Sequence, residues 1–171
     1  PQATVARCGD TTLTYQELDL RSNRLAQTLS SQSKGEFVVA LLAERGLEML
    51  TAMVAIFKAQ GAYMPLDPKL PMARLETLLS LLAEQNPSHS KQGKSAHHSE
   101  KEILLLASKT CVDLAQSLQT ALHRLDTHSF RSRVIFIEDH WLSGNSNLLA
   151  CSKAPSLEQL AYVLFTSGST G

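Results

Sequence analysis

The sequence contains few of the residues that mark disulfide-rich or metal-binding proteins. It has three cysteines among 171 residues, Cys8, Cys111 and Cys151, and none of them forms a C-x-x-C pair. An odd and widely spaced set argues against a disulfide framework and against a zinc site. Because this pattern is typical of reduced, intracellular proteins, we expect a cytoplasmic location.

Long apolar runs, an excess of one charge and aromatic residues are also scarce. The longest apolar runs, residues 37–43 and 103–107, are much shorter than a membrane span. Basic and acidic side chains number 16 each, and aromatic residues make up 5% of the chain. This composition gives no electrostatic basis for binding nucleic acid. We therefore expect neither a nucleic-acid partner nor a membrane partner.

The residues that are present indicate a folded domain that begins with a helix. The hydrophobic fraction is 43% and the charged fraction is 19%, as in ordinary globular proteins. Thr14 is followed three residues later by Glu17, which is the spacing of a helix-capping box. Apolar residues then recur at the spacing of a helical face at Leu18, Leu25, Ala26 and Leu29. We predict a helix that begins near Thr14 and ends at Lys34-Gly35.

Two further helices are predicted in the next part of the chain. Gly61 is predicted to cap the first of them at its C-terminus, and Pro71 to open the second. The apolar face of the first comprises Leu47, Leu50, Val54 and Phe57, with Met49, Met53 and Ile56 beside it. The apolar face of the second comprises Leu75, Leu78, Leu79 and Leu82.

Apolar segments of strand length alternate with the helices. Residues 37–42 form a continuous apolar run, which is typical of a buried strand in a parallel sheet. A fourth helix is predicted over residues 112–125. The other predicted strands are residues 62–66, 103–107, 134–137 and 160–165. This alternation predicts an α/β fold, with a mostly parallel sheet layered with helices.

Residues 85–101 differ in character from the rest of the chain. They are rich in Ser, Lys, His and Gln, and we predict an exposed, disordered insertion. Gly93-Lys94-Ser95 imitates part of a Walker loop, but the motif needs a glycine where Ser88 stands and a strand before it. The nearby histidines have no Cys or carboxylate at a ligand spacing, so we predict no metal site at His89, His97 and His98.

The last predicted strand runs directly into glycine and hydroxyl residues. Gly168 and Gly171 allow a sharp backbone turn, and the hydroxyl groups add neutral hydrogen-bond donors. At the carboxyl end of a strand in an open α/β sheet, such a group of donors binds phosphate oxygens. Taken alone, these residues leave a plain flexible loop open as the alternative. The predicted phosphate-binding residues are Thr166, Ser167, Gly168, Ser169, Thr170 and Gly171.

Three segments resemble, in order, the first three core motifs of adenylation domains of nonribosomal peptide synthetases. Residues 13–18 (LTYQEL) resemble L-T-Y-x-E-L, and residues 57–67 (FKAQGAYMPLD) are similar to L-K-A-G-x-A-Y-x-P-L-D. Residues 160–171 (LAYVLFTSGSTG) resemble L-A-Y-x-x-Y-T-S-G-S-T-G. The second segment departs from the pattern at Phe57 and Gln60, which puts the local backbone geometry in question. Pro68-x-x-Pro71-x-x-Arg74-Leu75 continues the resemblance.

The resemblance implies a fold, an activity and a set of ligands. Residues 1–171 would be the N-terminal part of the large lobe of an AMP-binding, adenylate-forming domain, which ends inside the phosphate-binding loop. In this family a carboxylate attacks the α-phosphate of ATP, with Mg²⁺ nearby, and the acyl group then passes to a phosphopantetheine carrier. The resemblance implies that residues 166–171 hold the β- and γ-phosphates. It places no catalytic or metal-binding residue within residues 1–171, so we expect the chain alone to be inactive.

Two other functions and several local interpretations stay open. The chain fits an acyl- or aryl-CoA ligase of the same superfamily, or a non-catalytic α/β remnant. The synthetase interpretation implies peptidyl carrier and condensation domains as partners and an amino acid as substrate. Residues 85–101 and 126–155 match the family weakly, which fits a divergent homologue, a mis-spliced gene or an insertion. We interpret Tyr15 and Tyr63 as packing residues and Asp139-His140 as part of a loop.

Overall fold

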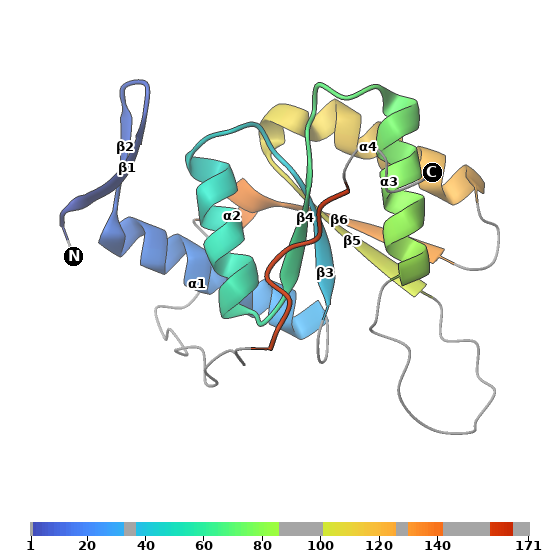
Figure 1. Ribbon diagram of the computed structural model, residues 1–171. Helices are drawn as coiled ribbons and strands as arrows, with labels where there is room; N and C mark the ends of the chain where they lie inside the picture. The colour runs from blue at the N-terminus through green and yellow to red at the C-terminus, as the bar shows by residue number, and fades with distance from the viewer. Residues whose placement is uncertain (1, 33–36, 86–100, 126–129, 142–157, 166–171) are drawn as a thin grey trace.

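A parallel sheet with helices on both faces forms the body of the molecule (Figure 1). The computed structural model describes residues 2–32, 37–85, 101–125, 130–141 and 158–165. Four strands pair in the order β4-β3-β5-β6, and every pairing in this sheet is parallel. The strands are β3 (Val38–Leu42), β4 (Ala62–Leu66), β5 (Lys101–Ala107) and β6 (Phe130–Phe136). The predicted α/β class with a mostly parallel sheet is therefore confirmed.

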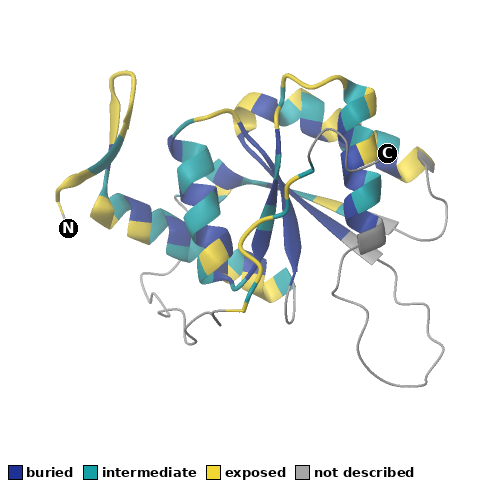
Figure 2. Ribbon diagram, viewed as in Figure 1, coloured by how far each residue is buried: buried dark blue, intermediate teal, exposed yellow. Residues whose placement is uncertain are grey.

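Two helices cover each face of the sheet, and Figure 2 shows the buried strands between them. In β3, Val38, Ala40 and Leu42 belong to the core under α3 and α4, whereas Val39 and Leu41 belong to the core under α1 and α2. This two-sided burial explains why β3 is a continuous apolar run. The helices are α1 (Tyr15–Gln32), α2 (Leu47–Lys58), α3 (Met72–Gln85) and α4 (Val112–Leu125).

The predicted capping box forms at the start of α1. The backbone N–H of Glu17 donates to Thr14 Oγ1 at 3.2 Å, and the backbone N–H of Thr14 donates to Glu17 Oε2 at 2.9 Å. The hydrogen bonds from Thr14 hold the pKa of Glu17 below its ordinary value. The helix ends at Gln32, and the predicted end at Lys34-Gly35 lies outside the described residues.

A β-hairpin that the sequence analysis did not predict precedes α1. It consists of β1 (Thr4–Cys8) and β2 (Thr11–Thr14), which pair antiparallel. Gly9 in the turn has a φ of 57°, a conformation that glycine adopts at little cost. Leu13 of β2 is fully buried in a small core with Leu18 and Leu47, so the hairpin is anchored to the first two helices.

The buried face of α2 differs from the predicted one. The residues that pack deepest are Thr51, Ala52, Ala55 and Ile56, while Phe57 is 39% exposed. Small residues on this face let the helix approach the sheet closely. Leu50 and Val54, which belong to the predicted stripe, pack instead against the small core beneath the hairpin. The prediction was wrong because it weighed large apolar side chains above small ones.

The C-terminal cap of α2 was also assigned to the wrong residue. Gln60, and not Gly61, has a positive φ of 62°. The N–H of Gln60 donates to the carbonyl of Phe57, and the N–H of Gly61 donates to that of Ile56, which is the pattern of a Schellman cap. A non-glycine residue in this conformation costs about 1–2 kcal/mol. Gln60 is the position at which the family motif has glycine, so the departure affects the backbone where the sequence placed it.

Residues 160–165, predicted as a strand, follow β4 without forming a regular strand. The N–H of Tyr63 donates to Ala161 O, and the N–H of Val163 donates to Tyr63 O, which makes one parallel bridge between Tyr63 and Tyr162. Figure 1 shows this segment in red beside β4. Leu160, Tyr162 and Leu164 are exposed on its outer side.

Three smaller features complete the comparison with the predicted elements. The predicted strand 134–137 is the end of a longer β6, and Ile137 already belongs to the short helix η3 (Ile137–His140). Gln85 ends α3 and Lys101 begins β5, so the rest of the predicted insertion lies outside the described residues. Within the described parts of the chain, no helix has the length and apolar character needed to cross a membrane.

We predict that Gly61→Ala destabilises the fold by about 1–3 kcal/mol, because the new methyl group would overpack a buried site. A Cβ at Gly61 would lie 2.8 Å from the ring of the buried Phe37 and 3.3 Å from Ile56 Cγ2. The matched control is Gly46→Ala, whose Cβ would closely approach only the flexible end of Glu48, at 2.9 Å. Urea unfolding should separate the two variants, and equal stabilities would contradict the tight packing at Gly61.

Candidate functional site

A groove of about 810 Å³ opens at the carboxyl edge of the sheet. Ligands of open α/β sheets bind at this edge. The groove is formed by the residues that follow β3 and β4, by α3 and by the end of the described chain. Its lining comprises Ala43, Glu44, Arg45, Met49, Met64, Pro65, Leu66, Asp67, Pro68, Lys69, Leu70, Arg74, Leu78, Leu164 and Phe165.

The groove combines an apolar floor with a charged rim. Met64, Leu66 and Leu78 are buried and belong to the core under α3. The charged residues of its lining are three cations and two anions: Arg45, Lys69, Arg74, Glu44 and Asp67. Such a surface can accept a ligand that has an anionic group, because the cations outnumber the carboxylates.

A tight turn connects β4 to α3 along the rim of the groove. Asp67 Oδ1 accepts a hydrogen bond from the N–H of Lys69 at 2.9 Å, and Asp67 O accepts one from the N–H of Leu70 at 3.0 Å. Pro68 occupies the second position of this turn, which suits its fixed φ. The sequence Asp-Pro therefore fixes the backbone of the rim.

The predicted phosphate-binding residues follow directly after a wall of the groove. Phe165 lines the groove, and Val163 and Phe165 pack against the core under α3 and α4. The predicted residues themselves lie outside the described residues: Thr166, Ser167, Gly168, Ser169, Thr170 and Gly171. Their attachment to Phe165 ties the start of the predicted loop to the groove.

The cationic residues of the rim were not predicted as site residues. Arg74 was noted only as part of the continued resemblance, and Arg45 and Lys69 were not singled out. The useful signal is the position of Lys69 and Arg74 between β4 and α3, directly after the carboxyl end of a parallel strand.

The other candidate sites carry no described chemistry. Gly93-Lys94-Ser95, the three histidines of that segment and Cys151 lie outside the described residues. Cys8 is exposed and Cys111 is buried. Among the residues that the structure describes, no three His, Cys, Asp or Glu side chains come close enough together to hold a metal ion.

Asp139 and His140 belong to η3 rather than to a loop, and their contacts are structural. Asp139 forms an ion pair with Lys109, and this partner raises the pKa of Lys109. His140 Nδ1 lies 3.1 Å from Thr28 Oγ1, and burial lowers the pKa of His140. Both residues tie η3 to neighbouring elements, so neither resembles half of a nucleophile–base pair.

Glu138 organises the same edge of the sheet and was not predicted. Its Oε1 accepts hydrogen bonds from Ser108 Oγ at 2.7 Å and from the N–H of Lys109 at 2.9 Å. The N–H of Ser108 in turn donates to Leu42 O at the end of β3. This carboxylate therefore joins the ends of β3, β5 and β6, at the edge where the groove opens.

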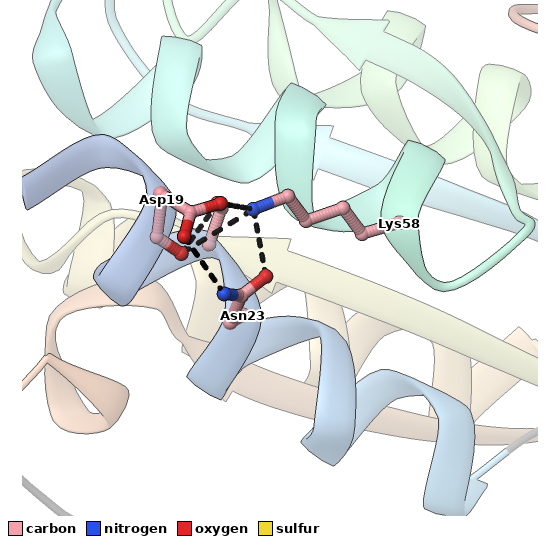
Figure 3. A network of polar contacts seen from close by, with 4 residues as sticks. Asp19, Asn23 and Lys58 are labelled. Atoms are coloured by element: carbon pink, nitrogen blue, oxygen red, sulfur yellow. Dashed lines mark hydrogen bonds and ion pairs between the residues drawn. The ribbon is translucent and has the colours of Figure 1, made fainter. Parts of the chain in front are cut away.

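Lys58, a member of the second motif, lies away from the groove and joins α2 to α1 (Figure 3). Its Nζ lies 2.6 Å from Asp19 Oδ1, 2.8 Å from Ser22 Oγ and 2.7 Å from Asn23 Oδ1. The side chain of Asn23 also donates to Asp19 Oδ2 at 3.2 Å. With these acceptors around it, the ammonium group has a structural role in the described fold.

The tyrosines of the motifs differ from each other in their surroundings. Tyr63 packs between Phe57 and Tyr162, with ring centroids 5.8 and 6.1 Å away. This agrees with its predicted packing role. Tyr15 is 57% exposed, which gives the same prediction no support at the start of α1.

Comparison with known proteins identifies similar sequences along the whole chain. A family model described as "AMP-binding enzyme" matches residues 1–171. A linear gramicidin synthase of Brevibacillus parabrevis is 35% identical over 175 residues, which cover 100% of this chain and 3% of that protein. Bacitracin synthase 2 of Bacillus licheniformis is 35% identical over 166 residues, which cover 95% of this chain and 5% of that protein. The chain thus spans a small part of the length of these relatives.

Solved structures resemble the fold. The nonribosomal peptide synthetase FmoA3 in its α-methyl-L-serine-AMP bound form has a TM-score of 0.67 at 23% identity, covering 97% of this chain and 15% of that chain. ATP-bound MatB from Rhodopseudomonas palustris has a TM-score of 0.67 at 17% identity, covering 100% of this chain and 30% of that chain. At these identities the similarity supports the fold alone.

We predict that Lys58→Met lowers the free energy of unfolding by about 1–3 kcal/mol, because it removes several hydrogen bonds between α1 and α2. The matched control is Lys69→Met, since the exposed side chain of Lys69 makes no hydrogen bond or ion pair among the described residues. Urea unfolding of both variants checks this. Equal stability of the two would show that the network in Figure 3 does not hold the helices together.

Proposed function

The chain belongs to the AMP-binding enzyme family, and from this premise we propose that residues 1–171 form part of an ATP-dependent, adenylate-forming ligase domain. This domain joins the carboxylate of an amino acid, or of a related acid, to the α-phosphate of ATP and releases pyrophosphate. The acyl group then passes to the thiol of phosphopantetheine on a separate carrier domain. Residues 1–171 are the N-terminal portion of this adenylation domain, with residues 85–101 as an exposed insertion.

The single observation that carries the proposal is the family match over residues 1–171, the whole of this chain. The names of the gramicidin and bacitracin relatives support peptide synthesis over the CoA-ligase alternative. Peptidyl carrier and condensation domains are therefore the proposed partners, and the cytoplasm is the proposed location. The groove beside Phe165 supports the proposal from the side of the structure, because it places a ligand-sized space where the predicted loop begins.

We assign phosphate binding to Thr166, Ser167, Gly168, Ser169, Thr170 and Gly171. Their backbone and hydroxyl donors would contact the β- and γ-phosphates, where negative charge grows as pyrophosphate leaves. The acyl-transfer thiol belongs to the carrier, so no cysteine of this chain has a catalytic role. No residue among 1–171 is assigned a catalytic role.

Mg²⁺ would reach this site bound to the triphosphate. The described residues around the groove include only two carboxylates, Glu44 and Asp67, and Asp67 Oδ1 already accepts the N–H of Lys69. This donor set does not make a protein-built cage, but it fits an ion that is held mainly by phosphate oxygens and water. When bound, the ion would neutralise the charge of the triphosphate.

A domain exchange tests the proposal. Residues 1–171 would replace the matching segment of the bacitracin synthase 2 domain that they resemble, and amino-acid-dependent exchange of pyrophosphate into ATP would be measured. We expect exchange by the chimera and none by residues 1–171 alone. Gly168→Val should lower the exchange rate by about tenfold or more, because a β-branched side chain crowds the backbone that approaches the phosphates.

The matched control for this variant is Gly93→Val, which makes the same change in the predicted insertion and should alter the rate by less than about twofold. Exchange by residues 1–171 alone would contradict the assignment of the missing groups to the rest of the domain. A folded chimera without exchange would contradict the proposed activity. Transfer of the acyl group to free CoA, with none to a carrier domain, would favour the ligase alternative.

A further inference from the structure

The residues proposed to hold the triphosphate carry no charge. They are threonines, serines and glycines, which offer neutral donors to a ligand with several negative charges. Hydrogen bonds to phosphate are roughly twice as strong when the donor is charged, and a guanidinium can bind two oxygens at once. A cation of the groove is therefore the natural complement to the neutral loop. This step rests on the proposed function.

Arg74 is a half-buried cation on the wall of the groove. Its side chain makes no hydrogen bond, ion pair or ring contact with any other residue that the structure describes. A partly buried charge is usually paired, because burial without a partner is costly. Arg45 and Lys69 also line the groove, but both are exposed, so water and salt screen their charges.

The backbone fixes the position of Arg74. Its N–H donates to Pro71 O at 2.9 Å in the first turn of α3, and the next residue, Leu75, is fully buried in the core. Arg74 and Phe165 line the same groove, and Phe165 directly precedes the proposed loop. A charged donor is thus held on the wall of the groove whose other lining residue leads into the neutral donors.

We propose that Arg74 binds the phosphate groups of ATP, as a charged complement to the loop that follows Phe165. The two carboxylates of the groove do not neutralise it, since Asp67 serves its own turn and Glu44 is exposed and not paired with Arg74. The ligand chemistry is a polyphosphate rather than a single carboxylate, because the proposed loop already supplies an extended set of phosphate donors.

The test is isothermal titration of the full chain with three probes: Mg²⁺-ATP, AMP and inorganic tripolyphosphate. Arg74→Ala should weaken the binding of ATP and tripolyphosphate by about tenfold, as expected for a lost charged hydrogen bond. Binding of AMP, which lacks the β- and γ-phosphates, should change by less than about twofold. Arg74→Lys keeps the charge and loses the fork, so it should weaken ATP binding by an intermediate factor.

The matched control is Arg124→Ala on α4, where the arginine is exposed and lies outside the groove. It should leave all three affinities unchanged. Thermal unfolding identifies a variant that fails to fold, and Arg74→Lys then carries the comparison alone. Equal ATP affinity in Arg74→Lys, Arg74→Ala and the parent chain would overturn this inference. Equal loss for ATP and AMP would also overturn it, because Arg74 would then act through the fold.

The proposed function and this inference fail in different ways. If the parent chain is folded and binds neither ATP nor tripolyphosphate, the phosphate-binding function of residues 166–171 is contradicted together with the role of Arg74. If the parent chain binds both and Arg74→Ala binds them equally well, only the role of Arg74 is contradicted.

Discussion

The shared direction of the strands is the constraint on which the rest of this structure depends. Leu42 at the end of β3 is paired with Leu66 on one side and with Ala107 on the other, so three strands end at one edge. Every connection that leaves this edge therefore begins beside the others. The groove and the hydrogen bonds of Glu138 both lie at this edge because the register brings these connections together.

Much of this arrangement could be predicted from local patterns in the sequence. The continuous apolar run of β3 indicated burial on both faces, and the Thr14–Glu17 spacing indicated the start of α1. These signals are reliable because each depends on residues that are close in the chain. The start of the candidate phosphate loop was predicted in the same way, from a strand-like run that leads into glycine and hydroxyl residues, although residues 160–165 form only one bridge.

The features that were missed depend on contacts between distant residues. Which face of α2 is buried follows from the close approach of Ala52 and Ala55 to the sheet, and side-chain size alone does not reveal it. Gln60 rather than Gly61 adopts the positive φ because Gly61 is needed where Phe37 leaves no room for a Cβ. The same holds for Arg74, whose place in the groove depends on the packing of α3.

Hydrogen–deuterium exchange of the full chain with and without Mg²⁺-ATP tests the central claim most directly, namely that ATP is held at the carboxyl edge of the sheet. The account predicts slower exchange on ATP binding in peptides that cover residues 66–75 and 163–171, and unchanged exchange in the hairpin, residues 4–14. Protection confined to α1, α2 or the hairpin would contradict it. Unchanged exchange along the whole chain at saturating ATP would contradict it as well.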